Sequence, residues 1–231
     1  MKILAIDTTE QACSAALLVD GRVAEDFRIA ARQHSQLILP MIEGLLGDAG
    51  LALSALDGLA FARGPGSFTG VRIAAAVVQG LAVAADLQVV PVSSLLALAQ
   101  GVYREHGEQR VLAAFDARMQ EIYWVPCEVR DGLMQFAGNE RVSALEAIAL
   151  PPGDDAWAMA GSALGAYGEA IEQQLGSRSG AHYPDAVVYA QDVALLAQQG
   201  FARGEAVAAE HAIPVYLRDQ VAHKMRSAGR A

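Results

Sequence analysis

The chain has 231 residues, of which 53% are hydrophobic and 19% are charged, a composition typical of a globular protein rather than a disordered one. Its 17 basic and 26 acidic residues leave a net charge of −9, which argues against nucleic-acid binding by the chain alone, because phosphate binding needs concentrated lysine and arginine. Two cysteines outside any Cys-x-x-Cys pair argue against a disulfide scaffold and a zinc finger and favour a cytoplasmic location.

The first thirty residues predict three strands of a mixed sheet. An apolar run ends in Asp7-Thr8-Thr9, and Asp20-Gly21 separates two further runs, which is a strong hairpin signal. The strands are expected at Ile3–Ile6, Cys13–Val19 and Arg22–Ile29. The motif Asp7-Thr8-Thr9 fits two interpretations: ordinary turn chemistry, or an acid and two hydroxyls that hold a metal or a phosphate. Because an acid occurs this early, the amino terminus does not resemble a signal sequence.

A helix with one broad apolar face is predicted to begin at His34-Ser35, with Ser35 as its N-cap, and to be ended by Gly47 and Gly50. Pro40 is expected to kink or delay its first turn. The large apolar side chains recur at helical spacing and are Leu37, Ile38, Met41, Ile42, Leu45 and Leu46. A short strand, Asp57–Ala62, is expected next.

A glycine turn that reads Gly64-Pro65-Gly66-Ser67-Phe68-Thr69-Gly70 joins this strand to the next helix. Its spacing does not match a P-loop, a dinucleotide fingerprint or a Gly-x-Ser-x-Gly nucleophile elbow. Gly66 and Ser67 therefore fit either a structural turn or an anion site made by the free N–H groups at the start of the helix.

The helix predicted at Gly70–Ala85 is apolar on nearly every face, and its only polar side chains are Arg72 and Gln79. Such a helix must be buried on nearly every side, whereas one sheet covers only one side. The apolar run Ile73–Ala85 is too short to span a membrane. We therefore expect a second helix or another protein molecule to cover the rest of this surface.

The order of elements restarts after residue 105. Val111–Phe115 ends in Asp116 as the first strand ends in Asp7, and Asp131-Gly132 marks another hairpin before a helix opens at Gly161-Ser162. Two related units indicate an α/β fold of two lobes, with mixed β-sheets flanked by helices, and this arrangement resembles the actin-like or sugar-kinase-like (ribonuclease-H-like) architecture. We divide the chain into a first lobe, 1–104, a second, 105–217, and a basic tail, 218–231, that is expected to be loose or packed on the first lobe.

Five motifs in combination point to one family. They are Ile-Asp-Thr-Thr at 6–9, His-Ser-Gln at 34–36, Gly-Pro-Gly-Ser-Phe-Thr-Gly-Val-Arg at 64–72, Asp-Ala-Arg-Met-Gln-Glu-Ile-Tyr-Trp at 116–124 and Pro-Val-Tyr-Leu-Arg-Asp at 214–219. With these motifs the chain resembles the TsaB family, formerly YeaZ, over essentially its whole length.

The resemblance implies a non-catalytic scaffold, a pseudoenzyme, in bacterial tRNA modification. In that family TsaB binds its catalytic paralogue TsaD, and the ATPase TsaE joins them in a ternary complex. TsaD transfers threonylcarbamoyl to the adenosine beside the anticodon of tRNAs that read codons beginning with A. We therefore expect a cytoplasmic heterodimer subunit without intrinsic cofactor, with ATP or ADP and metal on the partner subunits. The chain would reach tRNA only through the complex, would not bind membranes, and would pair with a second copy when TsaD is absent.

Histidine spacing separates this chain from the enzyme. TsaD holds its metal with a His-x-x-x-His helix motif, whereas this chain has His34 but carries Ile38 at the second position. No His-Glu-x-x-His motif or activated Ser67 signature indicates a peptidase. The alternatives to a scaffold are a nucleotide hydrolase or kinase that uses the Asp7 turn and Gly161-Ser162, and a peptidase. We expect no catalytic residue, no metal site, and no transferase, peptidase or significant ATPase activity from the isolated chain.

Two sets of residues are candidate contacts. The expected partner interface lies on the two apolar helices, at Leu37, Ile38, Met41, Ile42, Leu45, Gly70, Ile73, Ala74, Val77 and Leu81. Met41→Asp or Leu45→Asp is expected to break it. A residual nucleotide or anion site is considered at Asp7, Thr8, Thr9, Gly66, Ser67, Gly161 and Ser162. Asp116, Arg118 and Glu121 fit either local ion pairs on an exposed hairpin or polar contacts between domains or with a partner.

Overall fold

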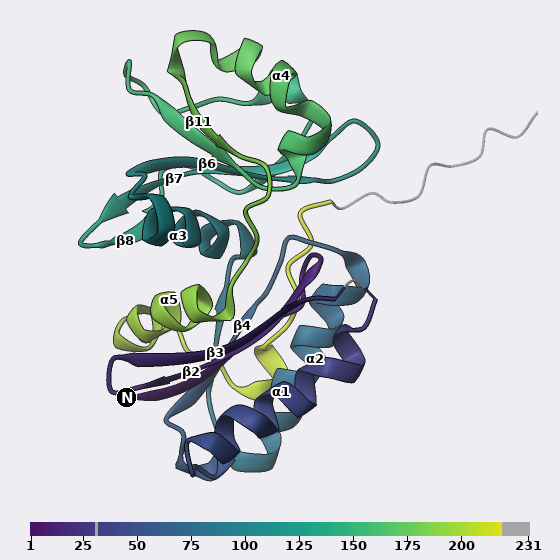
Figure 1. The fold of residues 1–231 in the computed structure, drawn as a ribbon, viewed down its shortest axis with the longest axis vertical. Coiled ribbons are helices and arrows are strands. Elements are labelled where there is room, and N and C mark those ends of the chain that lie inside the picture. Colours follow the sequence, from purple (N-terminus) through teal and green to yellow (C-terminus); the bar gives the residue numbers. More distant parts are fainter. Residues whose placement is uncertain (31, 219–231) are drawn as a thin grey trace, which may run out of the picture.

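The computed structural model describes residues 1–30 and 32–218 and contains two mixed β-sheets with two helices between them (Figure 1). The first sheet has the strand order β3-β2-β1-β4-β5. Its strands are β1 (Lys2–Asp7), β2 (Ala12–Val19), β3 (Arg22–Ile29), β4 (Gly58–Ala62) and β5 (Val89–Val92). The second sheet has the order β11-β10-β6-β7-β8, and β9 also pairs with β7. Its strands are β6 (Arg110–Asp116), β7 (Ile122–Arg130), β8 (Leu133–Phe136), β9 (Arg141–Ser143), β10 (Trp157–Ala160) and β11 (Ser179–Tyr183).

The two sheets repeat one plan, which confirms the predicted fold class of two mixed-sheet lobes. In each sheet a central strand, β1 or β6, pairs antiparallel with the strand that follows it and parallel with a strand that comes later. Asp20-Gly21 and Asp131-Gly132 each form a two-residue hairpin turn with both residues at positive φ. Aspartate followed by glycine suits this turn because its two central residues adopt left-handed conformations.

The helices form the outer layers and the middle layer of the molecule (Figure 1). Their bounds are α1 (His34–Asp48), α2 (Phe68–Ala85), α3 (Ser94–His106), α4 (Ala163–Leu175) and α5 (Ala190–Ala202), with short 3-10 turns at Leu53–Ala55, Leu145–Ala147, Gly176–Arg178 and Ala209–His211. Helices α1 and α2 cover the outer face of the first sheet, and α4 covers the outer face of the second. Helices α3 and α5 lie between the sheets: α5 packs against the first sheet, α3 packs against the second, and the two helices contact each other.

The middle layer is one continuous hydrophobic core. It joins Leu18 from the first sheet and Phe115 from the second through Leu98 of α3 and Val193 of α5, all of them buried. Because one cluster of buried side chains runs from the first sheet through the two helices to the second, the two lobes share a continuous interior.

The chain returns to the first sheet after it has built the second. Helix α5 contacts β1 and β2, the Val207 backbone pairs with Val89, and the Val215 N–H donates to the Arg63 carbonyl oxygen at 2.9 Å. The sequence division after residue 104 therefore separates the two sheets, whereas the segment after Tyr189 packs on the first sheet. Most of the predicted basic tail, residues 219–231, lies outside the described residues.

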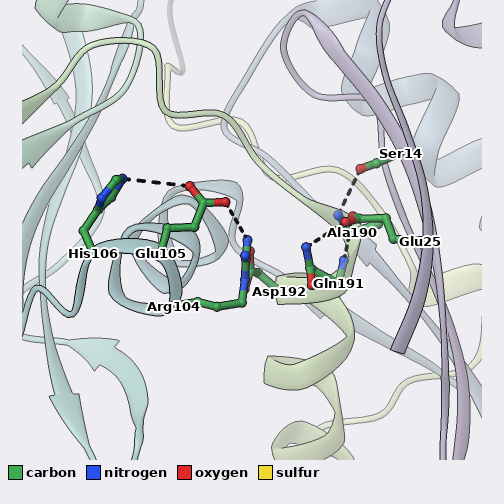
Figure 2. Close-up of polar contacts among 8 residues, drawn as sticks. All are labelled: Ser14, Glu25, Arg104, Glu105, His106, Ala190, Gln191 and Asp192. Atoms are coloured by element: carbon green, nitrogen blue, oxygen red, sulfur yellow. Dashed lines mark hydrogen bonds and ion pairs between the residues drawn. The ribbon is translucent and has the colours of Figure 1, made fainter. Parts of the chain in front are cut away.

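Polar contacts fix the start of α5 against the first sheet (Figure 2). The Ala190 N–H donates to Ser14 Oγ at 2.9 Å, and the Gln191 N–H donates to Glu25 Oε1 at 3.0 Å. Near this end of the helix, Arg104 of α3 donates two hydrogen bonds of 2.9 Å to the fully buried carboxylate of Asp192. These contacts give the free N–H groups of α5 partners from β2 and β3.

Several element boundaries differ from the sequence prediction. Helix α2 begins at Phe68 because Ser67 Oγ accepts a hydrogen bond from the Gly70 N–H at 3.1 Å. The N-cap of α1 is Gln33, not Ser35, and it makes no side-chain cap. With 18 residues, α2 is longer than the predicted apolar run, and it is the one helix among the described residues whose length and composition would suit a membrane span. A third of it is buried, and that part packs on the first sheet.

Candidate functional site

The glycine turn before α2 packs directly on the turn after β1. The Ser67 N–H donates to the Thr9 carbonyl oxygen at 2.6 Å, and Thr8 Oγ1 donates to the Gly70 carbonyl oxygen at 2.7 Å. A methyl group on Gly66 would lie 2.5 Å from the Thr9 oxygen, and one on Gly70 would collide with the Thr8 oxygen. The two glycines therefore allow two backbone segments to touch, and this contact accounts for their presence without a ligand.

Asp7 is a fully buried carboxyl group within this turn. Its Oδ1 accepts hydrogen bonds from the Thr9 N–H at 3.1 Å and the Thr9 hydroxyl at 2.6 Å, whereas its Oδ2 has no partner in the described part of the chain. Burial raises the pKa of Asp7 to about 7, and the nearby carboxylates of Glu10 and Glu25 add to this effect.

Glu10 and Ser162 meet between the two lobes. The Ser162 hydroxyl donates to Glu10 Oε2 at 3.2 Å and accepts a hydrogen bond from the Asp116 N–H at the same distance. Burial raises the pKa of Glu10 to about 7, and the Asp116 carboxylate also raises it. The structure thus brings together acidic groups of both lobes, where a bound phosphate would meet negative charge.

The other proposed nucleotide contacts have internal roles. Gly161 has a φ of 106°, and a methyl group there would collide with the Ala114 carbonyl oxygen. The described residues contain no group of three or more His, Cys, Asp or Glu side chains that could hold a metal. Sequence reasoning missed Glu10, because it follows the Asp-Thr-Thr turn without any periodic signal. The nucleotide site remains a prediction.

Asp116, Arg118 and Glu121 form one local ion pair and one contact with a distant part of the chain. Arg118 Nη1 lies 3.0 Å from Asp116 Oδ2, which is a local ion pair on the β6–β7 turn. Glu121 pairs instead with Arg218, far along the chain. The second pair ties the carboxyl-terminal segment to the second lobe.

The expected partner interface requires a correction. Six of its ten residues are buried inside the chain itself and face the first sheet: Ile38, Met41, Ile42, Leu45, Gly70 and Ala74. They cannot contact a partner unless the fold opens. The other four, Leu37, Ile73, Val77 and Leu81, are half-buried at the edges of the two helices.

The surface of α2 that does face outward carries mostly apolar residues, several of them small. Its exposed positions are Phe68, Thr69, Arg72, Ala76, Gly80, Val83 and Ala84. Val83 is 74% exposed, and no heavy atom lies within 4 Å of a methyl group placed on Gly80 or on Gly44 and Gly47 of α1. We call this outward surface of α1 and α2 the outer helical face. Its small residues leave room for another helix to approach closely.

Comparison with known proteins decides the family. A protein-family model described as "TsaD: tRNA N6-adenosine threonylcarbamoyltransferase" matches residues 28–225. The chain is 43% identical over 233 residues to the tRNA threonylcarbamoyladenosine biosynthesis protein TsaB of Escherichia coli, with 97% of each chain covered, and 38% identical to that of Haemophilus influenzae, with 97% of this chain and 96% of the relative covered. The chain belongs to the TsaB family.

Solved structures agree with this assignment. YeaZ from Pseudomonas aeruginosa superposes with a TM-score of 0.86 at 46% identity, covering 94% of this chain and 99% of that one. A second structure, described as an uncharacterized protein with similarity to peptidase YEAZ from Pseudomonas aeruginosa, gives a TM-score of 0.88 at 47% identity, with the same coverage. The family is therefore shown by sequence over the whole chain and by fold.

In this TsaB family member, the two positions of the His-x-x-x-His motif, 34 and 38, have structural roles. His34 is buried, and its Nε2 lies 3.1 Å from the Ala12 carbonyl oxygen, within hydrogen-bond distance. Ile38, one helical turn later, is fully buried in the core between α1 and the first sheet. An apolar side chain at that position cannot ligate a metal.

Proposed function

We propose that this chain is the non-catalytic subunit that binds TsaD in tRNA threonylcarbamoyladenosine biosynthesis and supports its transfer of threonylcarbamoyl to the adenosine beside the anticodon. The observation that carries the proposal is the exposed outer helical face, in a chain that matches the transferase family model over residues 28–225. Exposed apolar residues such as Phe68, Ala76 and Val83 are the kind of surface that protein interfaces use.

The likeness between this chain and the transferase favours TsaD as the occupant of that face. Paralogues inherit the same helices, and an interface that once joined two identical chains can come to join two different ones. Helices α1 and α2 of each subunit would then pack side by side in one bundle. The same surface would pair two copies of this chain when TsaD is absent.

The residues of this chain suit a scaffold better than an enzyme. The hydroxyls of Thr8, Thr9 and Ser162 form hydrogen bonds within the fold, and Ser67 caps α2. Burial raises the pKa of the Cys13 thiol to about 11 and that of Cys127 well above its usual value, so neither is a reactive nucleophile. In this proposal TsaE joins the complex, and nucleotide, metal and tRNA are bound by the partner subunits.

The test is a charge placed on the outer helical face. Ala76 is exposed on α2, so Ala76→Glu should fold normally, yet it buries a carboxylate when TsaD binds. We expect affinity for TsaD to fall at least about tenfold, and tRNA modification by the reconstituted TsaD–TsaE system to fall with it. Ala166→Glu, the same change at an exposed position of α4, is the matched control and should have no effect.

The opposite result is equally clear. If Ala76→Glu is folded by circular dichroism and binds TsaD as tightly as the unmodified chain does, the outer helical face is not the interface. The Met41→Asp change suggested by the sequence does not test the proposal, because Met41 is 1% exposed and its replacement would disrupt the core.

A further inference from the structure

The turn between β6 and β7 has an unusual backbone. Arg118, Met119 and Gln120 are three consecutive non-glycine residues with φ of 64°, 57° and 63°. Residues with a Cβ enter this left-handed region singly and at a cost, because Cβ crowds the following carbonyl oxygen. Strain of this kind persists only where the surroundings enforce it, and it gathers at functional positions. We call residues 118–120 the Met119 turn.

The surroundings hold the Met119 turn from both ends. The Ala117 N–H donates to the Glu121 carbonyl oxygen at 3.0 Å, and the Glu121 N–H donates to the Arg118 carbonyl oxygen at 3.1 Å. Asp116 Oδ1 accepts from the Arg118 N–H at 2.7 Å. The fixed turn projects the Met119 side chain outward, where it is 64% exposed. The fold thus maintains a strained backbone and displays an apolar side chain on it.

The carboxyl-terminal segment joins this turn to the outer helical face. At one end, Gln79 Nε2 of α2 donates to the Ala212 carbonyl oxygen at 3.1 Å. In the middle, the rings of Phe68 and Tyr216 have centroids 6.3 Å apart. At the other end, Arg218 pairs with Glu121, and its Nη1 lies 3.7 Å from Met119 Sδ. Residues 212–218 therefore run from α2 to the second lobe.

Exposed apolar side chains concentrate along this path. Eight large ones are exposed among the described residues, and five of them belong to α2, the carboxyl-terminal segment or the Met119 turn: Phe68, Val83, Met119, Ile213 and Tyr216. The guanidinium carbon of Arg72 lies 3.2 Å from the centroid of the Phe68 ring and 5.3 Å from that of Tyr216. Aromatic, methionine and arginine side chains are the types enriched where proteins bind one another.

We propose that Met119, together with Phe68, Arg72 and Tyr216, forms a second contact with the partner that occupies the outer helical face, so that TsaD is held by both lobes of this chain. This inference rests on the proposed function. The inference is supported by the continuity of the two surfaces: Phe68 and Arg72 lie on α2, and the segment that ends at Arg218 leads from them to Met119. The turn keeps its strained shape so that Met119 reaches the partner.

The charges of this surface favour a protein over RNA. Arg118 is paired with Asp116, and Arg218 is paired with Glu121, so two of its three arginines are already neutralised. Of the three, only Arg72 lacks an acidic partner among the described residues, and its guanidinium group lies over the Phe68 and Tyr216 rings. Binding to a nucleic-acid backbone depends on several uncompensated positive charges.

A matched pair of glycine substitutions tests the proposal. Met119→Gly and Gln120→Gly each remove the backbone strain of one left-handed residue. Both variants should therefore fold, and their unfolding temperatures should equal or exceed that of the parent chain. Only Met119→Gly removes the proposed anchor. We expect it to weaken binding of purified TsaD by about tenfold or more, while Gln120→Gly binds as the parent chain does. Titrating TsaD over each full-length variant immobilised on a sensor surface measures both affinities.

Each remaining outcome overturns the inference. If Met119→Gly binds TsaD normally while Ala76→Glu does not, the second contact is wrong and the proposed function stands. If the two glycine variants lose affinity equally, the shape of the turn and not the Met119 side chain is required. If Met119→Gly binds TsaD normally but the assembled system needs more tRNA for half-maximal modification, the surface belongs to the RNA. Failure of Ala76→Glu to weaken TsaD binding counts against the proposed function itself.

Discussion

The charge state of single carboxyl groups should govern how stability depends on pH. Asp7 is fully buried with an unpartnered Oδ2, and its pKa rises from an ordinary value of 3.8 to about 7. Between these values the unfolded chain has released the proton and the folded chain still holds it. The free energy of unfolding should therefore fall as pH rises from 4 to 7, by up to about 1.4 kcal/mol per pH unit for this one group.

Asp7→Asn should flatten that dependence. An amide keeps an oxygen for the Thr9 hydrogen bonds and has no proton to lose, so urea unfolding between pH 4.5 and 8 should show a shallower slope than the parent chain. Part of the slope should remain, because burial also raises the pKa of Glu10 and Glu25 to about 7. Asp154→Asn, at an exposed aspartate, is the control. An unchanged slope in Asp7→Asn would show that this carboxyl is ionised at pH 4.5.

At the scale of elements, α5 depends on caps from the first sheet. Its own N-cap residue, Tyr189, makes no side-chain cap, and the first N–H groups donate to Ser14 and Glu25 instead (Figure 2). Glu25→Ala should lower the free energy of unfolding by about 1–2 kcal/mol, as the loss of an N-cap does. Glu43→Ala, at an exposed position of α1, should change it by less than about 0.5 kcal/mol. Equal effects of the two changes in urea unfolding would argue against capping.

Helix α2 offers a second prediction at this scale. Gly80 is exposed in its middle with nothing within 4 Å of an added methyl group, so Gly80→Ala should stabilise the isolated chain by about 0.5–1 kcal/mol. Gly58→Ala should do the reverse, because the methyl group would collide with the Phe201 ring. Thermal unfolding of the two variants should move in opposite directions. A Gly80→Ala variant that melts earlier would mean that the position is already packed.

The sequence was informative where local chemistry decides the structure. The Asp-Gly hairpins and the two related sheets could be predicted because turn residues and apolar runs act locally. Strand β11 was not predicted, since Ser179–Tyr183 has little apolar character.

The candidate site was harder to read. A helix that is apolar all round, such as α2, gives no sign of which side its own sheet covers, so buried residues such as Ala74 were placed on the partner surface. The sequence Arg-Met-Gln at 118–120 also does not predict a left-handed turn, because none of the three residues is glycine. Asp116, two residues before Arg118, holds the turn through a local hydrogen bond, whereas Arg218 contacts it from far along the chain, which local sequence patterns do not show.

At the scale of the whole molecule, the shared middle core predicts that both lobes unfold together. The two tryptophans of the chain, Trp124 and Trp157, are both buried in the second sheet, so their fluorescence reports on that lobe. Leu4→Ala, a core change in the first sheet, should destabilise the protein by about 2–5 kcal/mol. We expect the tryptophan transition in urea to shift by the same amount as the circular dichroism transition. Two separated transitions would show that the lobes are independent.

The position of α5 also affects how the protein is made. A ribosome completes the first sheet at β5 but adds α5, which covers the inner face of that sheet, only after the whole second sheet. At about 5–20 residues per second, an apolar sheet face stays uncovered on the nascent chain for on the order of ten seconds. Translation is then the period in which this protein is most exposed to aggregation, and chaperones that bind nascent chains have their target in the uncovered inner face of β1 and β2.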